Sequence, residues 1–486
     1  MKKLYTIILA FVIATISSCT YEFPVADPLV PGTADFTKVV AVGNSLTAGY
    51  MNGALYDQGQ AASYANIVAQ QMKFNGGGEF NQPNIDAADG YYGLAPDGMT
   101  PLGRLHFVNP LNPGPAPIVP GQFITPYVGD KAALNNFGVP GMRVIDAAFS
   151  GYAPANPYFG RFASSLSATV LGDAIGANGT FIIFWLGNND VLGYASGGAT
   201  GNPSGTNPGD MTDPVVFDIA YKSAVSSLIT NDGKQGILAN IPSVQDIPFF
   251  TYIEWDAIPL DQATADLANG GYATFNGGIK AYNAGMLPGQ DPLNPPAVKR
   301  DTIGFKAGQN AIVITDVTIP DLSDYLIPSI RQAKSTDLIT LTAGAVLGTL
   351  ANPPGNDPTL IVGVTVPLGE QYTLIEADQV AIADRIANFN SIINSVVEGS
   401  GGSLALMDMN MVFADFAQNG ASINGSGLSA SFLPPNGAFS LDGVHPNPRG
   451  AAYVASLFID RINEFFGSNI PNINPNDYPG NELPVP

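Results

Sequence analysis

Residues 180–190 read TFIIFWLGNND. The first seven of them, mostly β-branched or aromatic and without polar alternation, are typical of a strand buried on both faces. The run stops at Gly187, and the three polar residues after it indicate a turn directly behind the strand. Strands buried on both faces occur in parallel sheets with helices on either side, so this stretch favours an α/β fold.

Other segments predict the neighbours of this strand. Short runs rich in β-branched and aliphatic residues predict strands at 38–42, 132–137, 235–241 and 403–407. Apolar residues at helical spacing predict helices at 61–72, 143–149, 214–229, 379–397 and 448–466. Because the strands alternate with helices, we expect a parallel sheet covered by helices on both faces.

Two long segments do not follow this alternation. Residues 75–130 are rich in Gly, Pro and Asn and predict a loop excursion over one edge of the core. Residues 245–372 have no clean strand–helix rhythm, and we interpret them as a large insertion or a small cap subdomain. The rest predicts one domain at 37–470, followed by a short tail at 471–486.

Both segments contain many aromatic side chains. These could stack on sugars or line a channel for an acyl chain, but we favour the interpretation that they form the core of the insertion. They are Tyr91, Tyr92, Phe107, Phe249, Phe250, Tyr252 and Trp255.

The N-terminus has the pattern of a secretory signal. Two lysines precede an apolar run at 4–16, and two serines then lead to Cys19. This end resembles the bacterial lipobox, which implies removal of residues 1–18 and lipid attachment at Cys19. Residues 19–36 would then be a tether to the bacterial envelope, and Thr20 after the cysteine favours the outer membrane. The alternative is an ordinary signal peptide with an incidental cysteine.

The charge and the cysteine count exclude several classes of function. There are 40 acidic and 19 basic residues, a formal charge of −21, which would repel nucleic acids and anionic membrane surfaces. A neutral ester or a sugar is unaffected by this charge. Cys19 is the only cysteine, so the monomer has no disulfide and no cysteine for catalysis or for a zinc site.

Ser45 follows the strand predicted at 38–42, within the sequence GNSLTAG at 43–49. In open α/β sheets, ligands bind at the carboxyl ends of the strands, where this serine would lie. A serine hydroxyl becomes a good nucleophile only when a base takes its proton. Alone, Ser45 could equally be a turn residue or a helix N-cap.

The chain has two histidines, His106 and His445. His445 lies in LDGVHP, three residues after Asp442, and a short turn of this length lets the carboxylate accept from one ring nitrogen and leaves the other free for a serine. The alternative is that Asp442 caps the following helix and His445 is incidental. His106 has no carboxylate near it in sequence, so we expect it to be structural or exposed.

Two further residues could stabilise negative charge on a substrate oxygen. The turn after residues 180–186 offers the side-chain amide of Asn189 as a donor to a developing oxyanion, although such a sequence also makes an ordinary turn. Gly141, after the strand at 132–137, could offer its backbone N–H.

Taken together, four segments resemble the motif blocks of the SGNH hydrolase superfamily (GDSL-like lipases and acylhydrolases), in the order of that family. The segments are GNSL at 43–46, NFGVPG at 136–141, GNND at 187–190 and DGVH at 442–445. The resemblance implies Ser45 as nucleophile, His445 as base and Asp442 as its orienting partner. It also implies Gly141, Asn189 and the Ser45 backbone N–H as oxyanion donors, with no metal or cofactor.

The resemblance covers about 37–73, 133–241 and 375–466, and it implies a three-layer α/β/α sandwich with a flavodoxin-like sheet. One departure is Asn44, where the family has Asp. The implied function is a serine ester hydrolase (an esterase or lipase) acting on acetylated glycans or on short-chain to lipid esters. The alternatives are a glycan- or ligand-binding surface lipoprotein without turnover on the same fold, and a structural or adhesion protein of the envelope, although the sequence has no internal repeat.

Overall fold

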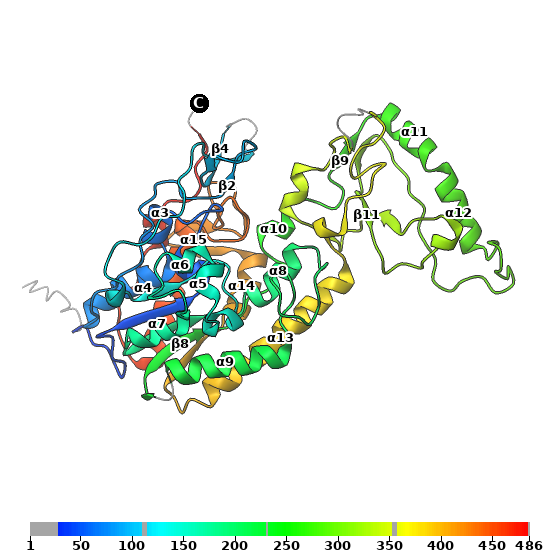
Figure 1. Ribbon diagram of the computed structural model, residues 1–486. Coiled ribbons are helices and arrows are strands. Elements are labelled where there is room, and N and C mark those ends of the chain that lie inside the picture. Colours follow the sequence, from blue (N-terminus) through cyan, green and yellow to red (C-terminus); the bar gives the residue numbers. More distant parts are fainter. Residues whose placement is uncertain (1–27, 109–113, 230–231, 352–356, 485–486) are drawn as a thin grey trace, which may run out of the picture.

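The computed structural model describes residues 28–108, 114–229, 232–351 and 357–484 (Figure 1). The predicted signal peptide, the lipidation site Cys19 and the first part of the predicted tether lie outside these residues.

A parallel sheet of five strands forms the centre of the described chain, which confirms the predicted α/β fold with a parallel sheet. Gly43, Trp185 and Gly138 are aligned across three neighbouring strands, so the turns that follow these strands leave the same edge. The strands, in spatial order, are β15 (Leu404–Met407), β8 (Gln235–Ala239), β7 (Phe181–Trp185), β1 (Val39–Gly43) and β6 (Asn136–Gly138).

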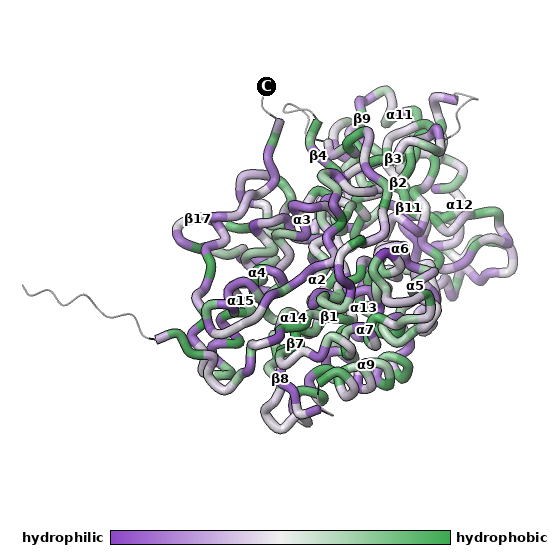
Figure 2. Tube along the Cα trace, turned by 60° about the vertical axis from the view of Figure 1, so that its left-hand side comes forward, coloured by the Kyte–Doolittle hydropathy of each residue, from purple (hydrophilic) through white to green (hydrophobic). Residues whose placement is uncertain are grey.

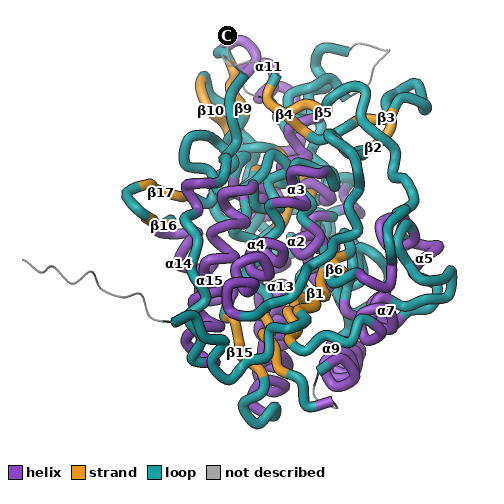
Figure 3. Tube along the Cα trace, turned by 90° about the vertical axis from the view of Figure 1, so that its left-hand side faces the viewer, coloured by secondary structure: helices purple, strands orange, loops and turns teal. Residues whose placement is uncertain are grey.

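Helices cover both faces of the sheet (Figure 3). Along β7, Phe181, Ile183 and Trp185 point into the hydrophobic cluster beneath one helical layer. Ile182 and Phe184 point into the cluster on the other face. The first layer is made of α4 (Tyr64–Met72) and α15 (Pro448–Phe466), and the second of α7 (Val170–Gly176), α9 (Pro214–Leu228) and α13 (Glu376–Glu398).

Hydrophobic residues, green in Figure 2, gather in this interior around α9, α14 (Met409–Asn419) and β7. Burying one large apolar side chain stabilises a fold by about 1.5–3 kcal/mol, so this two-sided core is what fixes the sheet in place. Short helices α2 (Ser45–Ala48), α3 (Asp57–Ala61), α5 (Tyr152–Ala155), α6 (Pro157–Gly160) and α8 (Asn189–Ser196) lie between the larger elements.

The boundaries of two predicted elements follow from their caps. Helix α15 spans the predicted residues because Asn447 caps its first turn by accepting from the Gly450 N–H at 3.0 Å, and Gly467 ends it in a left-handed conformation. The strand predicted at 132–137 is shorter, because Asp130 accepts from the Ala132 N–H and turns residues 131–133 into a 3-10 helix. The helix predicted at 143–149 is likewise a 3-10 helix, η3 (Val144–Ala148).

The described residues of the segment 75–130 run as loops and short hairpins along the body of the protein. Arg161 fixes them, since its guanidinium donates to the carbonyls of Thr125, Pro83 and Asn84. The hairpins pair β2 (Gly93–Leu94) with β3 (Pro101–Leu102) and β4 (Leu105–Phe107) with β5 (Pro115–Pro117).

Residues 253–351 and 357–373 form a lobe that stands apart from the sheet (Figure 1). The lobe has its own hydrophobic cluster, which includes Ile312, Ile314 and Ile339. A buried Arg331 joins Asp316 and Asp337 at 2.6 and 2.5 Å inside it. Its elements are β9 (Ile258–Leu260), α11 (Gln262–Gly271), α12 (Ala273–Asn283), β10 (Gly308–Asn310), β11 (Val313–Thr315), β12 (Ile330–Gln332) and β13 (Leu338–Ile339), and β14 (Thr373–Leu374) leads back to α13.

Both ends of the described chain pack on the body. The segment predicted as a tether is in contact with it from Pro28 onward. The Pro28 carbonyl accepts from the Asn469 amide, the Val30 N–H donates to the Asn469 side-chain oxygen, and Phe36 is buried in the core. The predicted tail also lies along the body, where Asn481 donates to the carbonyls of Phe432 and Phe439.

Candidate active site

Ser45 lies where β1 passes into α2. The Asn44 side chain accepts from the Leu46 N–H at 3.0 Å and so caps this helix. Gly43 has no room for a side chain, because a Cβ there would come within 2.0 Å of the Thr47 hydroxyl oxygen and 2.9 Å of the Trp185 carbonyl oxygen. The tight packing forces a sharp turn that holds Ser45, itself buried, at the carboxyl end of the sheet.

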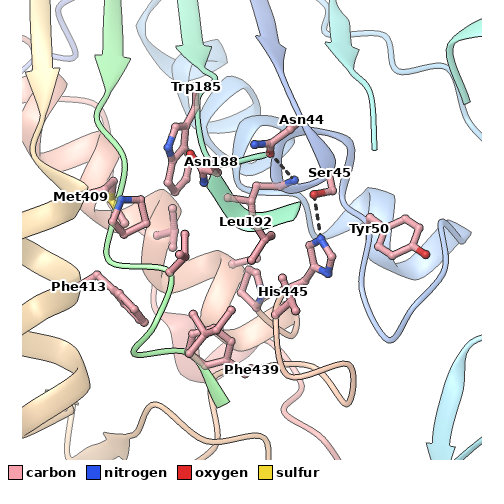
Figure 4. A pocket seen from close by; sticks show the side chains of 18 of the residues that line it. Asn44, Ser45, Tyr50, Trp185, Asn188, Leu192, Met409, Phe413, Phe439 and His445 are labelled. Carbon is pink, nitrogen blue, oxygen red and sulfur yellow. Dashed lines mark hydrogen bonds between the residues drawn. The ribbon is translucent and has the colours of Figure 1, made fainter. Parts of the chain in front are cut away.

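His445 connects Ser45 to Asp442, and its hydrogen bond with Ser45 is drawn in Figure 4. Its Nε2 lies 2.8 Å from the Ser45 Oγ, and its Nδ1 lies 3.0 Å from Oδ2 of Asp442. The other carboxylate oxygen of Asp442 accepts from the backbone N–H groups of Val444 and His445, both at 2.9 Å. The alternative that Asp442 caps the last helix is wrong, since Asn447 is that cap.

The electrostatics of Asp442 favour one tautomer of His445. Burial by itself would raise the pKa of Asp442, but the charge of His445 and the hydrogen bonds from His445 and Val444 outweigh it and lower the pKa to about 2. The carboxylate is therefore ionised at neutral pH and accepts the Nδ1–H. This leaves the lone pair of Nε2 directed at the hydroxyl of Ser45.

A loop shortly after Ser45 supports Asp442. The Gly53 N–H donates to Oδ2 of Asp442 at 2.9 Å, and the Asn52 N–H donates to the Ser440 hydroxyl at 2.9 Å. The Asn52 side chain accepts in return from the Leu441 N–H at 2.8 Å. These contacts were not predicted. The Asn52-Gly53 pair is a recognisable turn signal, but a turn signal does not reveal a partner almost 400 residues away.

The aromatic ring of Tyr50 packs against the imidazole ring of His445 in a tilted arrangement. The centroids of the two rings are 5.0 Å apart, and the tyrosine hydroxyl donates to the Gly53 carbonyl. Burial raises the pKa of Tyr50 well above its ordinary value, so this hydroxyl stays a hydrogen-bond donor at neutral pH. No pattern in the sequence marks Tyr50 as part of the site either.

Asn189 and Gly141 occupy the turns after β7 and β6. The Asn189 amide nitrogen donates one hydrogen to the Met142 carbonyl at 3.0 Å, which leaves its second hydrogen for another acceptor. Asn189 lines the same cavity as Ser45 and His445. Gly141 does not line that cavity. It is exposed, and it adopts a left-handed φ of 81° that favours glycine.

Asp190 holds the turn that carries Gly141 and Met142 against β7. Its buried carboxylate accepts from the Val144 N–H at 2.9 Å and from the Thr212 hydroxyl at 2.8 Å. Burial raises the pKa of Asp190 to about 7 from its ordinary 3.8.

Asp190→Asn is expected to flatten the dependence of stability on pH. In the wild type the folded state keeps the Asp190 proton up to about pH 7 while the unfolded chain releases it near pH 4, so this group makes the free energy of unfolding fall as pH rises through that window. Between pH 5 and 8 the fall amounts to about 2–3 kcal/mol. Urea unfolding at both pH values measures it, with Asp218→Asn on the surface as control. Equal pH dependence in wild type and Asp190→Asn would contradict this assignment.

A cavity of about 120 Å³ opens beside Ser45 and His445. Its walls include apolar side chains of α14, α15 and the segment after β8. The seven aromatic residues considered in the sequence for a sugar or acyl site do not line it. Instead, Phe107, Phe249 and Phe250 belong to the core of the main body, and Trp255 packs on the core of the lobe.

The segment that leads from the body into the lobe contacts the turn between Asp442 and His445. The Phe249 N–H, in α10 (Pro248–Thr251), donates to the Gly443 carbonyl at 2.9 Å, so this segment contacts the residue that follows Asp442. His106 lies apart from this site, partly buried on β4, with its Nδ1 2.9 Å from the Ala116 carbonyl oxygen.

Among residues 28–108, 114–229, 232–351 and 357–484, no group of three or more His, Cys, Asp or Glu side chains is arranged to hold a metal ion. Within the same described ranges, no helix combines the length and the apolar character needed to cross a membrane. In comparisons with known proteins, no family model matches the chain, and neither a curated protein nor a solved structure matches it.

Proposed function

We propose that this chain is a carboxylic ester hydrolase of the SGNH (GDSL-like) type. One observation carries the proposal: an unbroken chain of hydrogen bonds runs from the Ser45 hydroxyl through both ring nitrogens of His445 to Asp442, with distances of 2.8 and 3.0 Å. A nucleophile, a base and a group that orients the base within hydrogen-bond reach of one another are the signature of covalent acyl transfer.

The mechanism follows from this arrangement. His445 takes the proton of Ser45 as the serine oxygen attacks the ester carbonyl, and Asp442 stabilises the imidazolium that forms. His445 then protonates the leaving alcohol. A water molecule repeats the cycle on the acyl-enzyme and releases the acid.

The oxyanion of the tetrahedral intermediate needs donors in place before it forms. We assign this role to the backbone N–H groups of Ser45 and Gly141 and to the Asn189 amide, whose second hydrogen has no acceptor among the described residues. Such donors are typically worth about 10²–10³ in rate each.

Membership in the SGNH superfamily is part of the proposal. It is supported by the order of the four motif segments along the chain and by their positions after β1, after β6, after β7 and before α15. The sheet order β15-β8-β7-β1-β6, with helices on both faces, is compatible with the three-layer flavodoxin-like arrangement of that family. Asn44, in place of the family's Asp, acts as a helix cap, a task that either residue performs.

We further propose that Cys19 carries lipid and holds the enzyme at the bacterial envelope, at the outer membrane. The lipobox-like sequence and the single cysteine of the chain support this. The substrate would then be an ester reached at the cell surface or in the periplasm.

A fluorophosphonate probe tests the proposed hydrolase. It is expected to attach once per chain, at Ser45, because the His445 base activates only that hydroxyl. Mass spectrometry of the digested protein locates the adduct. Ser45→Ala should take up no probe, and His445→Ala should react far more slowly. A wild-type protein that stays unlabelled but binds a glycan tightly would instead be a surface binding protein.

A further inference from the structure

We propose that the cavity beside Ser45 is an acyl-chain pocket and that the substrates are esters of straight medium-chain acids, about six to eight carbons long, rather than acetyl esters. This inference rests on the proposed function and names its substrate class. It comes from the chemistry of the walls, the size of the cavity, its continuation into the core and a buried polar side chain in its wall whose oxygen has no partner among the described residues.

The walls suit a hydrocarbon chain and not a sugar. Opposite Ser45 they consist of Trp185, Met409, Phe413, Phe439 and Val454 (the first four labelled in Figure 4), none of which brings a hydrogen-bonding group for a row of hydroxyls. The Trp185 indole N–H is already engaged, since it donates to the Asn240 carbonyl at 3.1 Å. A sugar placed there would lose its hydrogen bonds to water without replacement, whereas a methylene chain loses none.

The volume sets the length of the chain. At about 120 Å³ the cavity is close to the roughly 150 Å³ of an engineered apolar cavity that accepts benzene. It therefore has room for about six carbon atoms beyond the reacting carbonyl.

A second apolar cavity, of about 50 Å³, continues from the first between α14 and α15. The two share part of their walls, with Met409, Phe413, Phe439 and Val454 bordering both. A methionine side chain is flexible, so a modest rotation of Met409 can join the two cavities. This continuation gives room for a chain somewhat longer than the first cavity alone would hold.

Asparagine side chains contribute to the polar part of the wall, with Asn44, Asn188 and Asn189 all lining the cavity. Asn188 is more than nine-tenths buried, it lines the cavity, and its side-chain oxygen has no hydrogen-bond partner among the described residues. Since a buried amide is normally paired, this one indicates that a bound molecule completes the site. This oxygen accepts hydrogen bonds, so its partner has to be a donor, which an ester lacks. The water that attacks the acyl-enzyme, or the protonated acid that forms from it, can donate here while the acyl chain lies in the apolar part.

The acyl group, rather than the alcohol, belongs in this pocket. The far wall is made of core side chains, Trp185 and Tyr64, that are at most 3% exposed, so the pocket leads into the interior of the protein. The acyl group stays bonded to Ser45 until water arrives, while the alcohol has to leave first. A pocket that ends in the core therefore suits the group that stays.

The first test is the kcat/KM of the purified protein on p-nitrophenyl esters from acetate to dodecanoate. We expect a rise of about fourfold per added methylene, or about 200-fold from acetate to hexanoate, levelling off near octanoate. Octyl acetate, which carries the chain on the alcohol side, should gain little over ethyl acetate. A profile that is highest at acetate, or octyl acetate gaining as much as the octanoate ester, would overturn the acyl pocket.

Two variants with opposite expected effects test the walls. Val454→Phe should fill the pocket and lower the octanoate-to-acetate ratio of kcat/KM at least tenfold. Phe413→Ala should join the cavities and move the best chain length upward by two or more carbons. Val380→Phe, at an exposed position on α13, is the matched control and should leave the profile unchanged. An unchanged chain-length profile in both wall variants, each folded by circular dichroism, would overturn the proposal.

A binding measurement separates this inference from the proposed function. Titration of octanoate into Ser45→Ala by calorimetry should give saturable binding, and Val454→Phe introduced into the same protein should weaken it at least tenfold. If wild type hydrolyses esters but octanoate does not bind, the acyl pocket is wrong and the hydrolase stands. If octanoate binds but no ester is hydrolysed and no phosphonate attaches, the hydrolase is wrong and the apolar ligand site stands.

Discussion

We expect Ser45→Ala to lower kcat for p-nitrophenyl esters by about 10⁵–10⁶-fold, which is the largest effect predicted for this protein. The substitution removes the only hydroxyl that accepts activation from His445, and it takes away no structural contact apart from the bond to Nε2. Residual catalysis of about 10³–10⁴ over water would come from the oxyanion donors and from binding. Initial rates at saturating substrate, measured with highly purified protein, give the value.

The matched control is Ser167→Ala, a serine in an exposed loop, which should hydrolyse esters at the wild-type rate. Thermal unfolding of Ser45→Ala should stay close to that of wild type, because the mutation leaves no buried polar group uncompensated in a packed core. A folded Ser45→Ala that keeps a tenth or more of the wild-type rate would rule out Ser45 as the nucleophile.

The second large effect is expected from Asp442→Asn, with kcat lower by about 10⁴-fold. An asparagine keeps the shape but carries no charge, so it no longer stabilises the imidazolium. If the NH₂ group takes the place of Oδ2, it faces two groups that donate to this oxygen in the wild type, the Gly53 N–H and the Nδ1–H of His445. The imidazole then favours the tautomer with a proton on Nε2, which cannot take the proton of Ser45.

Steady-state kinetics and the rate of phosphonate labelling both measure this loss, and they should fall together because both depend on the base. Asp218→Asn, which removes one partner of a surface ion pair with Lys222, is the control and should change neither rate. If Asp442→Asn labels as fast as wild type, Asp442 only shapes the turn and His445 is oriented by other groups.

The sequence predicts a helix or strand well where the residues of that element themselves carry the pattern. β7 is continuous in its apolar character because both faces of the sheet bury it, and the sequence predicts it to within one residue at each end. The same holds for α15, where proline, asparagine and glycine mark both ends. The segments around Ser45 and His445 could be paired because the chain offers only two histidines, and only one has a carboxylate in reach.

The remainder depends on contacts between distant segments. The support that Asn52 and Gly53 give to Asp442 and its turn leaves no periodic pattern in the sequence. The cavity beside Ser45 draws its walls from Met409, Phe413 and Phe439, which in sequence are ordinary core residues. The sequence predicts the lobe only as an insertion, because its strands are two or three residues long and are too short to show a periodic pattern of apolar residues.

The hydrogen bond between Ser45 and His445 closes a loop of 400 residues, and this separation has a consequence for biosynthesis. At about 5–20 residues per second, a ribosome needs about 20–80 s to travel from the codon of the serine to that of the histidine. During this time the growing polypeptide carries the nucleophile without its base, and the edge strand β15 is also still missing. If the proposed function holds, hydrolytic activity can therefore begin only after His445 has been synthesised, and a product terminated before that residue would be inert.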